Sequence, residues 1–325
     1  MAATKALIAF AGFAAAAISG ANAIAQEYPV KPVRFIVPFA PGGAGDVVAR
    51  ALAVKLAETW GHQFVIDNRA GGGGNIGAQL AAIAAPDGYT ILLGTQSTQV
   101  IGPCLQAHPP YDPVRDFAPV ALTVQIPNVL IAHPSLPAYS VRELIQIARA
   151  RPSQLTYGSS GTATSSHLAG ALLMNMAQIE LTHVPYRGGG PALADILAGH
   201  VQLMFGSVST SLPYVKAGRL RALGIASAKR TPAAPDYATI AESGLPGFEV
   251  VNWLGVLAPA RTPQGIIAQL NAALVQIVRA PDFAERFINL GIEPSASTPQ
   301  AFGAYMRSDI AKWSKVIRDT GIRIE

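Results

Sequence analysis

The stretch VRFIVPFAPGGAGDVVARALAVKL, residues 33–56, contains a complete strand–loop–helix unit. Its first five residues, 33–37, form a β-branched run that ends at Pro38 and predicts a short buried strand. A loop rich in glycine follows at residues 40–45. Apolar residues then recur at the spacing of one helix face, at Val47, Val48, Ala51, Leu52 and Leu56. We therefore expect a strand and a helix joined by a glycine loop.

The same unit recurs along the rest of the chain. Further strands are expected near residues 64–66, 89–93, 129–132, 155–157, 181–184, 201–205 and 222–226. Helices are expected near residues 76–84, 141–150, 162–172, 193–197, 263–277 and 299–317. Alternating strands and helices predict an α/β fold with mostly parallel sheets covered by helices. Ligands of such folds bind beyond the carboxyl ends of the strands.

Three helix starts carry recognisable signals. Ser140 and Glu143 have the spacing of a capping box. Thr262 and Thr298 are each followed by proline, which predicts a threonine N-cap and a proline at the first helical position. We therefore expect a helix to begin directly after each of these three residues.

The N-terminus has the three parts of a secretory signal peptide. Lys5 precedes the uncharged residues 6–18, and the small residues 19–25 contain an A-x-A cleavage pattern. Cleavage after Ala23 or after Ala25 fits, and the polar residues that follow favour Ala25. The apolar run is shorter than the roughly 20 residues of a membrane-spanning helix, and no cysteine stands directly after it to accept a lipid. We therefore predict export to the periplasm as a soluble, unanchored protein.

Composition argues against several classes of function. Removal of residues 1–25 leaves 300 residues, enough for two domains. The net charge is +5 without a run of Lys or Arg, so no nucleic-acid partner is expected. Cys104 is the only cysteine, and the six histidines are scattered, at positions 62, 108, 133, 167, 183 and 200. This spacing predicts neither a disulfide nor a metal site.

Two loops have the residues of an anion site. Residues 42–45, Gly-Gly-Ala-Gly, lie between an expected strand and helix, and residues 158–162, Gly-Ser-Ser-Gly-Thr, have the same place further along. The free N–H groups and the dipole of a helix N-terminus favour an anion there. Glycine lets a ligand approach the backbone, and hydroxyl groups donate to carboxylate oxygens. Ordinary turns use the same residues, but several such loops in one chain favour binding.

Enzymatic alternatives fit these residues less well. Residues 72–77 spell G-x-G-x-x-G, yet a dinucleotide site needs an acidic residue about 20 positions further on, where Leu92 stands. Residues 158–160 suggest a nucleophile elbow, but the pattern G-x-S-x-G needs glycine where Thr162 stands. No glycine-rich loop ends in the Gly-Lys-Ser/Thr of a nucleotide P-loop. The sequence therefore predicts a protein without a catalytic site or a cofactor.

Six motifs follow one another along the chain. They are Pro41-Gly42-Gly43-x-x-Asp46, Asp67-Asn68-Arg69-Ala70-Gly71-Gly72-Gly73-x-x-Ile76-Gly77, Pro86-Asp87-Gly88-Tyr89-Thr90, Tyr157-Gly158-Ser159-Ser160-Gly161-Thr162 with His167-Leu168, Val184-Pro185-Tyr186-Arg187-Gly188 and Asn252-Trp253-Leu254-Gly255. In this order they resemble the Bug-type substrate-binding proteins of tripartite tricarboxylate transporters. The resemblance runs from about Tyr28 to the C-terminus, and the set is far more specific than any single motif.

The resemblance implies a type II periplasmic-binding-protein fold, with two lobes around a central cleft and two crossovers. We expect crossovers near Pro127 and near residues 250–253, with residues 26–126 and 253–325 in the first lobe and 127–252 in the second. Ligands of the family are small mono-, di- or tricarboxylates, often held by backbone amides and ordered water. The implied partners are integral-membrane transporter subunits, and we expect a monomer.

The candidate ligand contacts lie in the loops after the expected strands. They are Pro41, Gly42, Gly43, Ala44, Asp46, Thr95, Ser97, Ser159, Ser160, Gly161, Thr162, His167, Tyr186 and Arg187. Asn68 and Arg69 are expected to hold the long glycine loop, with contact to the ligand as the alternative. His167 fits either a packed or a ligand-facing imidazole, and Arg187 either a clamp on the ligand or a residue of the cleft rim.

The residues leave two functions open. A transport receptor and a sensor that presents a carboxylate to a membrane receptor would use the same cleft. The identity of the carboxylate is not encoded either, because recognition by backbone and water uses few side chains.

Overall fold

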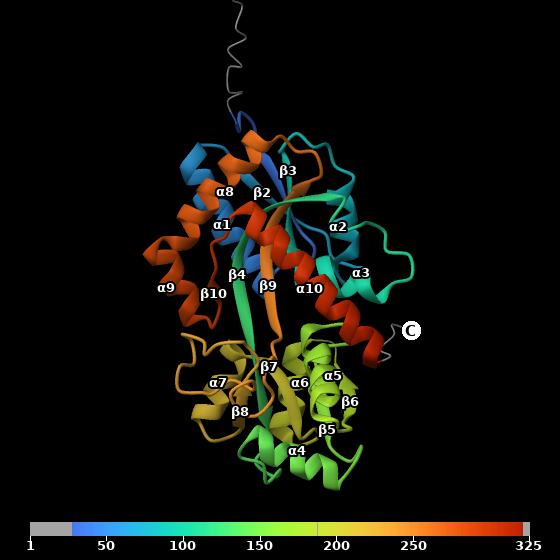
Figure 1. Cartoon of the computed structure of the whole chain (residues 1–325). Helices are drawn as coiled ribbons and strands as arrows, with labels where there is room; N and C mark the ends of the chain where they lie inside the picture. The colour runs from blue at the N-terminus through green and yellow to red at the C-terminus, as the bar shows by residue number, and fades with distance from the viewer. Residues whose placement is uncertain (1–27, 187, 321–325) are drawn as a thin grey trace, which may run out of the picture.

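Residues 28–186 and 188–320 are described by the computed structural model of this chain (Figure 1). The predicted signal peptide and both of its cleavage sites lie outside these residues, and so does Arg187. Within the described residues, no helix combines the length and the apolar character needed to cross a membrane.

Strands and helices alternate through most of the chain, as expected. The strands are β1 Val33–Val37, β2 Phe64–Asn68, β3 Thr90–Thr95, β4 Phe117–Ala132, β5 Thr156–Ser159, β6 Thr182–Pro185, β7 Leu203–Ser207, β8 Arg221–Ile225, β9 Val251–Pro259 and β10 Glu293–Pro294. The helices are α1 Ala44–Trp60, η1 Gly72–Gly74, α2 Asn75–Ala82, η2 Ser97–Ile101, α3 Gly102–Leu105, α4 Val141–Ala150, α5 Ser165–Ala177, α6 Gly189–Ala198, α7 Val208–Lys216, α8 Gln264–Arg279, α9 Pro281–Asn289 and α10 Pro299–Thr320.

The strands form two parallel groups linked by two antiparallel strands. The order is β2-β1-β3-β9-β4-β7-β5-β6, with β10 and β8 also paired to β4. β1 is parallel to β2 and β3, and β5 is parallel to β6 and β7. Every antiparallel pair includes β4 or β9. We call the part built on β1, β2 and β3 the first lobe and the part built on β5 to β8 the second lobe; Figure 1 shows them above and below each other.

β4 passes from one lobe into the other. It pairs with β9 as far as Pro127, and from Asn128 onward it pairs with β7. The return follows at Val250, whose N–H donates to Ala226 O in the second lobe directly before β9 begins. These changes of partner lie where the crossovers were expected, and the lobe boundaries themselves stay a prediction.

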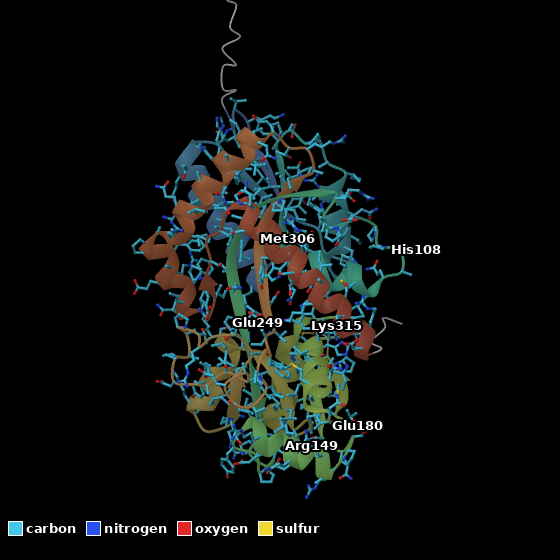
Figure 2. The ribbon with its side chains drawn as sticks, in the orientation of Figure 1. His108, Arg149, Glu180, Glu249, Met306 and Lys315 are labelled. Carbon is cyan, nitrogen blue, oxygen red and sulfur yellow. The ribbon has the colours of Figure 1, made fainter. Side chains whose placement is uncertain are left out.

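The longest helix ties the two lobes together. α10 carries Met306 and Trp313, which are both buried, and it runs from the first lobe down to the second (Figure 2). One apolar core joins Ile36 of the first lobe, Trp313 of α10 and Phe205 of the second lobe. Burial of large side chains of this kind contributes about 1.5–3 kcal/mol each. The lobes therefore share a core beside the crossovers.

The three predicted helix starts have different outcomes. Ser140 caps α4, because its Oγ accepts the N–H of Glu143 at 3.2 Å, and Thr298 Oγ1 accepts the N–H of Ala301 at 3.2 Å. The Thr262 prediction is wrong. α8 begins at Gln264 without a side-chain cap, and the Thr262 hydroxyl donates to Pro259 O at 2.7 Å instead.

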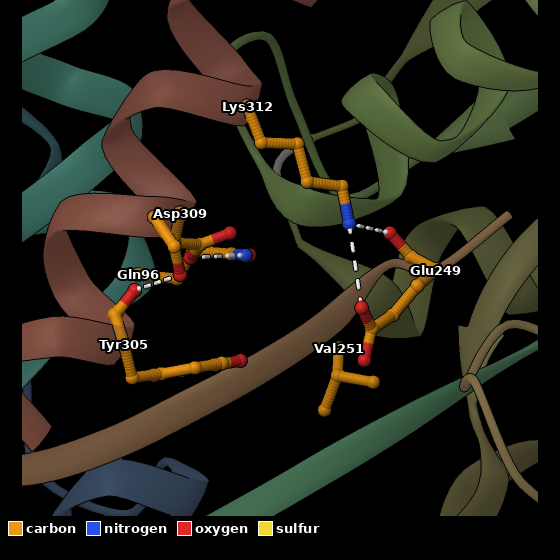
Figure 3. A pocket seen from close by; sticks show the side chains of 7 residues that line it. Gln96, Glu249, Val251, Tyr305, Asp309 and Lys312 are labelled. Carbon is orange, nitrogen blue, oxygen red and sulfur yellow. Dashed lines mark hydrogen bonds and ion pairs between the residues drawn. The ribbon is translucent and has the colours of Figure 1, made fainter. Parts of the chain in front are cut away.

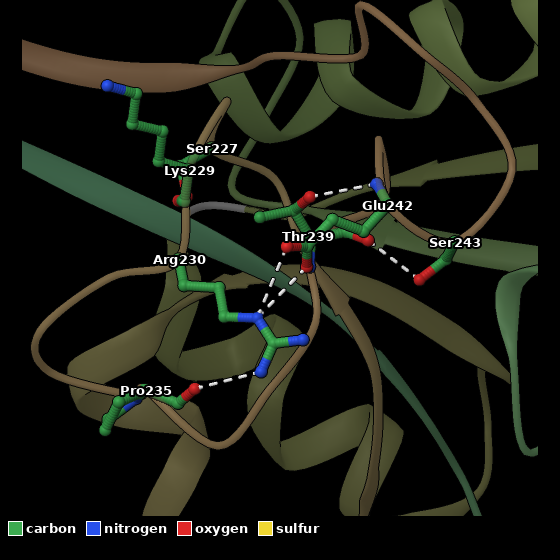
Figure 4. A network of polar contacts seen from close by, with 7 residues as sticks. All are labelled: Ser227, Lys229, Arg230, Pro235, Thr239, Glu242 and Ser243. Carbon is green, nitrogen blue, oxygen red and sulfur yellow. Dashed lines mark hydrogen bonds and ion pairs between the residues drawn. The ribbon is translucent and has the colours of Figure 1, made fainter.

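A polar network orders the long connector between β8 and β9, which no sequence pattern had suggested (Figure 4). Thr239 Oγ1 accepts the N–H of Glu242 at 3.0 Å, and Glu242 Oε2 accepts the N–H of Thr239 at 2.8 Å. This reciprocal pair is the geometry of a capping box, used here in a turn. Arg230 reaches the same carboxylate at 3.2 Å, and the Ser243 hydroxyl donates to Thr239 O at 2.7 Å.

Candidate ligand-binding site

Strand directions place the predicted loops of both lobes at the junction between them. β4 runs from the first lobe into the second, and β9 is antiparallel to it. β3 is antiparallel to β9, so β3 and its parallel neighbours β1 and β2 end toward the second lobe. β7 is antiparallel to β4, so β7, β5 and β6 end toward the first lobe. The carboxyl ends of both parallel groups therefore point to the junction.

The loop between β1 and α1 is held from below by one carboxylate. Asp46, in the first turn of α1, is buried and accepts three hydrogen bonds. They come from Gly42 N–H at 3.0 Å, Arg50 Nε at 2.9 Å and Asn68 Nδ2 at 2.9 Å. Asn68 Nδ2 also donates to Phe39 O at 3.0 Å. The bond from Arg50, assisted by those from Gly42 and Asn68, lowers the pKa of Asp46 to about 2.

This arrangement separates two roles within the first loop. The N–H of Gly42 is already used by Asp46, whereas Gly43 is the N-cap of α1 and Ala44 its first residue. The first N–H groups of a helix have no partner within it. Pro41 to Ala44 are exposed, and the space beside Gly43 is open for 4 Å around the position of a Cβ. Asp46 thus shapes the loop, and the N–H groups of Gly43 and Ala44 lie at the exposed start of α1.

In the second lobe, hydroxyl groups hold the loop between β5 and α5. Ser166 is buried, and its Oγ accepts the N–H of Ser160 and lies 2.9 Å from Ser160 Oγ. Thr164 is the N-cap of α5, and its hydroxyl donates to Gly161 O at 2.7 Å. The N–H of Ser160, a candidate ligand contact, is therefore already hydrogen-bonded to Ser166. Ser166 was not predicted, because nothing in the sequence distinguishes it from its serine neighbours.

Gly161 and Thr162 form the outer part of this loop. Gly161 has a φ of +131°, which side chains rarely tolerate, and its N–H donates to Ser159 Oγ at 3.2 Å. Thr162 is exposed, and no residue in the described part of the chain bonds to its hydroxyl. Among the predicted donors of this lobe, Thr162 is therefore the one presented to solvent.

Beneath the loop, Ser159 is paired with a histidine that the sequence analysis did not select. Ser159 Oγ lies 2.7 Å from His183 Nε2 on the neighbouring strand β6, and Ser159 is fully buried. His183 stacks on His167 of α5, with ring centroids 4.1 Å apart and planes 10° apart. Burial, and then the neighbouring His167, lower the pKa of His183 to about 4. Burial also lowers the pKa of His167.

A serine 2.7 Å from an imidazole is also the arrangement of a nucleophile and its general base. Ser159 has no exposed surface, so a substrate cannot approach its hydroxyl, and a pKa near 4 makes His183 a weak base at neutral pH. The pair holds the loop in this geometry.

The remaining candidates are engaged in local contacts. The hydroxyl of Tyr186 donates to Asp195 at 2.7 Å; burial, and then Asp195, raise its pKa to about 12. Thr95 is buried, and its Oγ1 accepts the N–H of Thr98 at 3.2 Å. Ser97 is half-buried at the start of η2. The hydroxyl groups of Tyr186 and Thr95 therefore already have partners within the protein.

A family model described as the tripartite tricarboxylate transporter family receptor matches residues 48–322 of this chain. The chain belongs to this receptor family. Protein BugT of Bordetella pertussis is 34% identical over 323 residues, which cover 99% of each chain. The family and the Bug-type resemblance are therefore confirmed.

Two solved structures extend the comparison to three dimensions. R. palustris Rpa4515 with adipate matches with a TM-score of 0.80 and 38% identity, over 91% of this chain and 99% of the other. MatC from Rhodopseudomonas palustris with bound malate matches with a TM-score of 0.76 and 33% identity, over 89% and 100%. The predicted periplasmic-binding-protein fold is confirmed by these matches. Both of these neighbours hold a small dicarboxylate.

The receptor's long glycine loop packs closely against the first one. The residues that spell G-x-G-x-x-G form the short turn η1 and the start of α2. A Cβ on Gly74 would lie 2.6 Å from Thr98, and one on Gly77 would lie 2.8 Å from Pro38. These glycines therefore serve close packing at the base of the loops. Asn68, expected to hold this loop, instead binds the first one, and Arg69 Nε donates to Asp67 at 2.8 Å.

A cavity of about 150 Å³ lies beside the crossover into β9, lined by α10 and by Gln96 (Figure 3). Gln96 Nε2 donates to Asp309 at 3.1 Å, and Trp253 Nε1 donates to the same oxygen at 2.9 Å. Lys312 donates to Glu249 O at 2.6 Å. None of the candidate ligand contacts lines this cavity. The cavity therefore lies apart from the two candidate loops, between α10 and the start of β9.

Proposed function

We propose that this chain is a periplasmic solute-binding protein that captures a small carboxylate between its lobes and leaves it chemically unchanged. The observation that carries the proposal is the pair of glycine and serine loops, each between a strand and a helix N-terminus, whose strands point to one junction from opposite lobes. Family membership, and the adipate and malate held by two similar receptors, support a carboxylate as the ligand.

Binding would follow from the charge and the exposed donors of the loops. A carboxylate at the N-terminus of α1 would accept the N–H groups of Gly43 and Ala44 and interact favourably with the helix dipole. A second carboxylate, or the far end of a shorter acid, would accept the hydroxyl of Thr162 in the second lobe. We keep Arg187, which follows Tyr186 in the sequence, as a further candidate. Asp46 would position the first loop without touching the ligand.

The transport role follows from the same family membership. We propose that the mature receptor begins near Gln26, works as a monomer in the periplasm and delivers its ligand to the integral-membrane subunits of a tripartite tricarboxylate transporter. Its lobes, residues 26–126 with 253–325 and residues 127–252, would close on the ligand about the two crossovers.

The test is a thermal-shift and calorimetry panel on the mature protein. Adipate, malate and shorter monocarboxylates are each compared with a neutral amide of the same length. A ligand that binds only the native state raises the melting temperature by mass action, by roughly 2.7 kcal/mol of stability at a hundredfold excess over Kd. We expect at least one acid to bind and its amide not to bind. Equal binding of acid and amide, or mass-spectrometric conversion of the bound acid, would overturn the proposal.

A further inference from the structure

Two histidines, His167 and His183, support the second-lobe loop, which we define as residues 159–164. They come from different elements, α5 and β6, yet their rings lie 4.1 Å apart and nearly parallel. Tyr157 stacks on His183, with ring centroids 4.9 Å apart. β5, β6 and α5, which carry these three rings, contain no charged side chain. The rings thus form an aromatic stack directly below the loop.

His167 holds the loop at a strained residue. Ala163 has a φ of +62°, a left-handed conformation that is uncommon for any residue other than glycine and needs support from its surroundings. Its N–H donates to His167 Nδ1 at 3.2 Å. This bond requires a lone pair on Nδ1, so the proton of the neutral ring lies on Nε2.

His183 holds the opposite end of the same loop. Its Nε2 lies 2.7 Å from Ser159 Oγ, and that oxygen accepts the N–H of Gly161. The two imidazoles therefore contact the loop at its first residue and at its fifth. Thr162, the exposed candidate donor, lies between these two points of attachment.

We infer that His167 and His183 are positioning residues of the carboxylate site: the neutral stacked imidazoles fix Ser159 and Ala163, and through them hold Thr162 and the N-terminus of α5 in place for the ligand. The inference rests on the proposed function. It assigns His167 a place beneath the ligand site, and it adds His183 to the residues on which binding depends.

If His167 and His183 served only to fill space, substitutions at these two positions would have different effects from those expected if their nitrogen atoms hold the loop. If the rings only fill space, phenylalanine should replace either of them without loss of binding. If their nitrogen atoms hold the loop, a side chain that keeps the bonding atom should preserve binding even without the ring. Asparagine places its Oδ1 near the position of histidine Nδ1, and glutamine reaches the position of Nε2. The pairs His167→Phe with His167→Asn, and His183→Phe with His183→Gln, separate the two roles.

The variants are compared by calorimetry with whichever of adipate and malate binds the wild-type protein more tightly. We expect His167→Phe to weaken binding by about ten- to a hundredfold, because the N–H of Ala163 loses its acceptor. His167→Asn should stay within about threefold of wild type. His183→Phe should weaken binding by roughly tenfold, and His183→Gln should restore most of it. Phenylalanine variants that bind like wild type, or amide variants as weak as their phenylalanine partners, would overturn the inference.

A measurement on the unmodified protein guards against variants that fail to fold. Two-bond proton–nitrogen NMR at neutral pH should show His167 as the neutral tautomer with its proton on Nε2, and the amide of Ala163 should exchange slowly. A charged His167, or a proton on Nδ1, contradicts the inference. If the wild-type protein binds neither acid nor any other member of the carboxylate panel, the proposed function fails. If it binds one and the phenylalanine variants bind it equally well, the inference alone fails.

Discussion

The two glycine-containing loops have the same place in their lobes but are held by opposite chemistry. The first-lobe loop, residues 38–43, depends on the charged Asp46, whose carboxylate accepts hydrogen bonds from Gly42, Arg50 and Asn68. The second-lobe loop depends on neutral groups, the hydroxyl of Ser166 and the rings of His167 and His183. Each arrangement leaves an outer donor uncommitted, Gly43 N–H in one and the Thr162 hydroxyl in the other.

This difference explains how the site that we propose for an anion could contain a buried carboxylate. Asp46 lies below the loop, and its charge is balanced by Arg50 at 2.9 Å, so a ligand at Gly43 meets N–H groups and the positive end of α1. In the second lobe, the contacts among the described residues that hold the loop involve no charged side chain, and hydroxyl groups and imidazole lone pairs act together. The first loop should therefore depend mainly on one residue, whereas the second should depend on several residues that each hold a different part of it.

The largest effect is expected at Asp46. Asp46→Asn would place an NH₂ group among three converging donors, so at least one of them loses its acceptor. We expect ligand affinity to fall about a hundredfold and unfolding free energy to fall by about 2 kcal/mol, measured by calorimetry and urea denaturation. Arg50→Gln is the control, because Arg50 is half-exposed and its loss should change affinity only about threefold. Wild-type binding by Asp46→Asn would show that the carboxylate does not shape the loop.

A substitution at Gly43 should have the next largest effect, and it should lower the affinity for the ligand without lowering stability. Its φ of −79° suits any residue and its Cβ position is open, so Gly43→Val should leave stability within about 0.5 kcal/mol. The side chain would stand where the ligand approaches, and affinity should fall roughly thirtyfold. Gly42→Ala is the matched control: with a φ of +88° it should cost about 1 kcal/mol of stability. If Gly43→Val folds and binds like wild type, the ligand lies elsewhere.

The two loops should also respond to different ranges of pH. Asp46, with a pKa lowered to about 2, stabilises the fold above its ordinary pKa of 3.8, and this stability is lost as the pH falls through 2. His183 is neutral in the folded protein, with its pKa lowered from 6.5 to about 4. As the pH falls below 6.5, His183 therefore becomes protonated in the unfolded chain while it stays neutral in the folded protein. Stability should decline between pH 6.5 and 4 and level off below that range.

The size of the histidine contribution can be measured by comparison with a variant. After allowance for the partial exposure of the His183 ring, we expect it to account for about 1–2 kcal/mol of the decline between pH 6.5 and 4. Urea denaturation of wild type and His183→Gln at several pH values provides the measurement. The variant should decline less over this interval, and an identical decline in both proteins would contradict the lowered pKa.

The smallest effect is expected at Thr162. Thr162→Val removes one hydroxyl at nearly constant volume from an exposed position, so stability should not change. Affinity should fall by about five- to tenfold, because one hydrogen bond to a carboxylate is lost. Thr162→Ser keeps the hydroxyl and should bind within about twofold of wild type. Equal affinities of the valine and serine variants would remove Thr162 from the site.

Local sequence patterns predicted much of this protein correctly. The strand at residues 33–37, the cap at Ser140 and the glycine loops between strand and helix all follow from residues within a few positions of each other. The series of motifs was enough to identify the receptor family. The cap at Thr262 was wrong, because its hydroxyl donates to a carbonyl group in the preceding turn, and Asn68 was assigned to the wrong loop. The lengths of β4 and β9 were not predicted, since both strands cross between lobes and have no local alternation to mark them.

Which loop donors remain available was decided by the tertiary structure alone. Asn68 lies 22 positions from Asp46, and His183 lies 24 positions from Ser159. Asn68 ends β2 and meets Asp46 at the start of the helix after the neighbouring β1, and Ser159 ends β5 beside His183 of the parallel β6. A hydrogen bond between such residues engages a donor, which is then no longer available to a ligand. No pattern in the linear sequence predicts which donors are engaged in this way. The sequence determined the loops and the family, and the fold decided that Gly42 and Ser160 use their N–H groups within the protein, which makes Gly43 and Thr162 the donors we propose for the ligand.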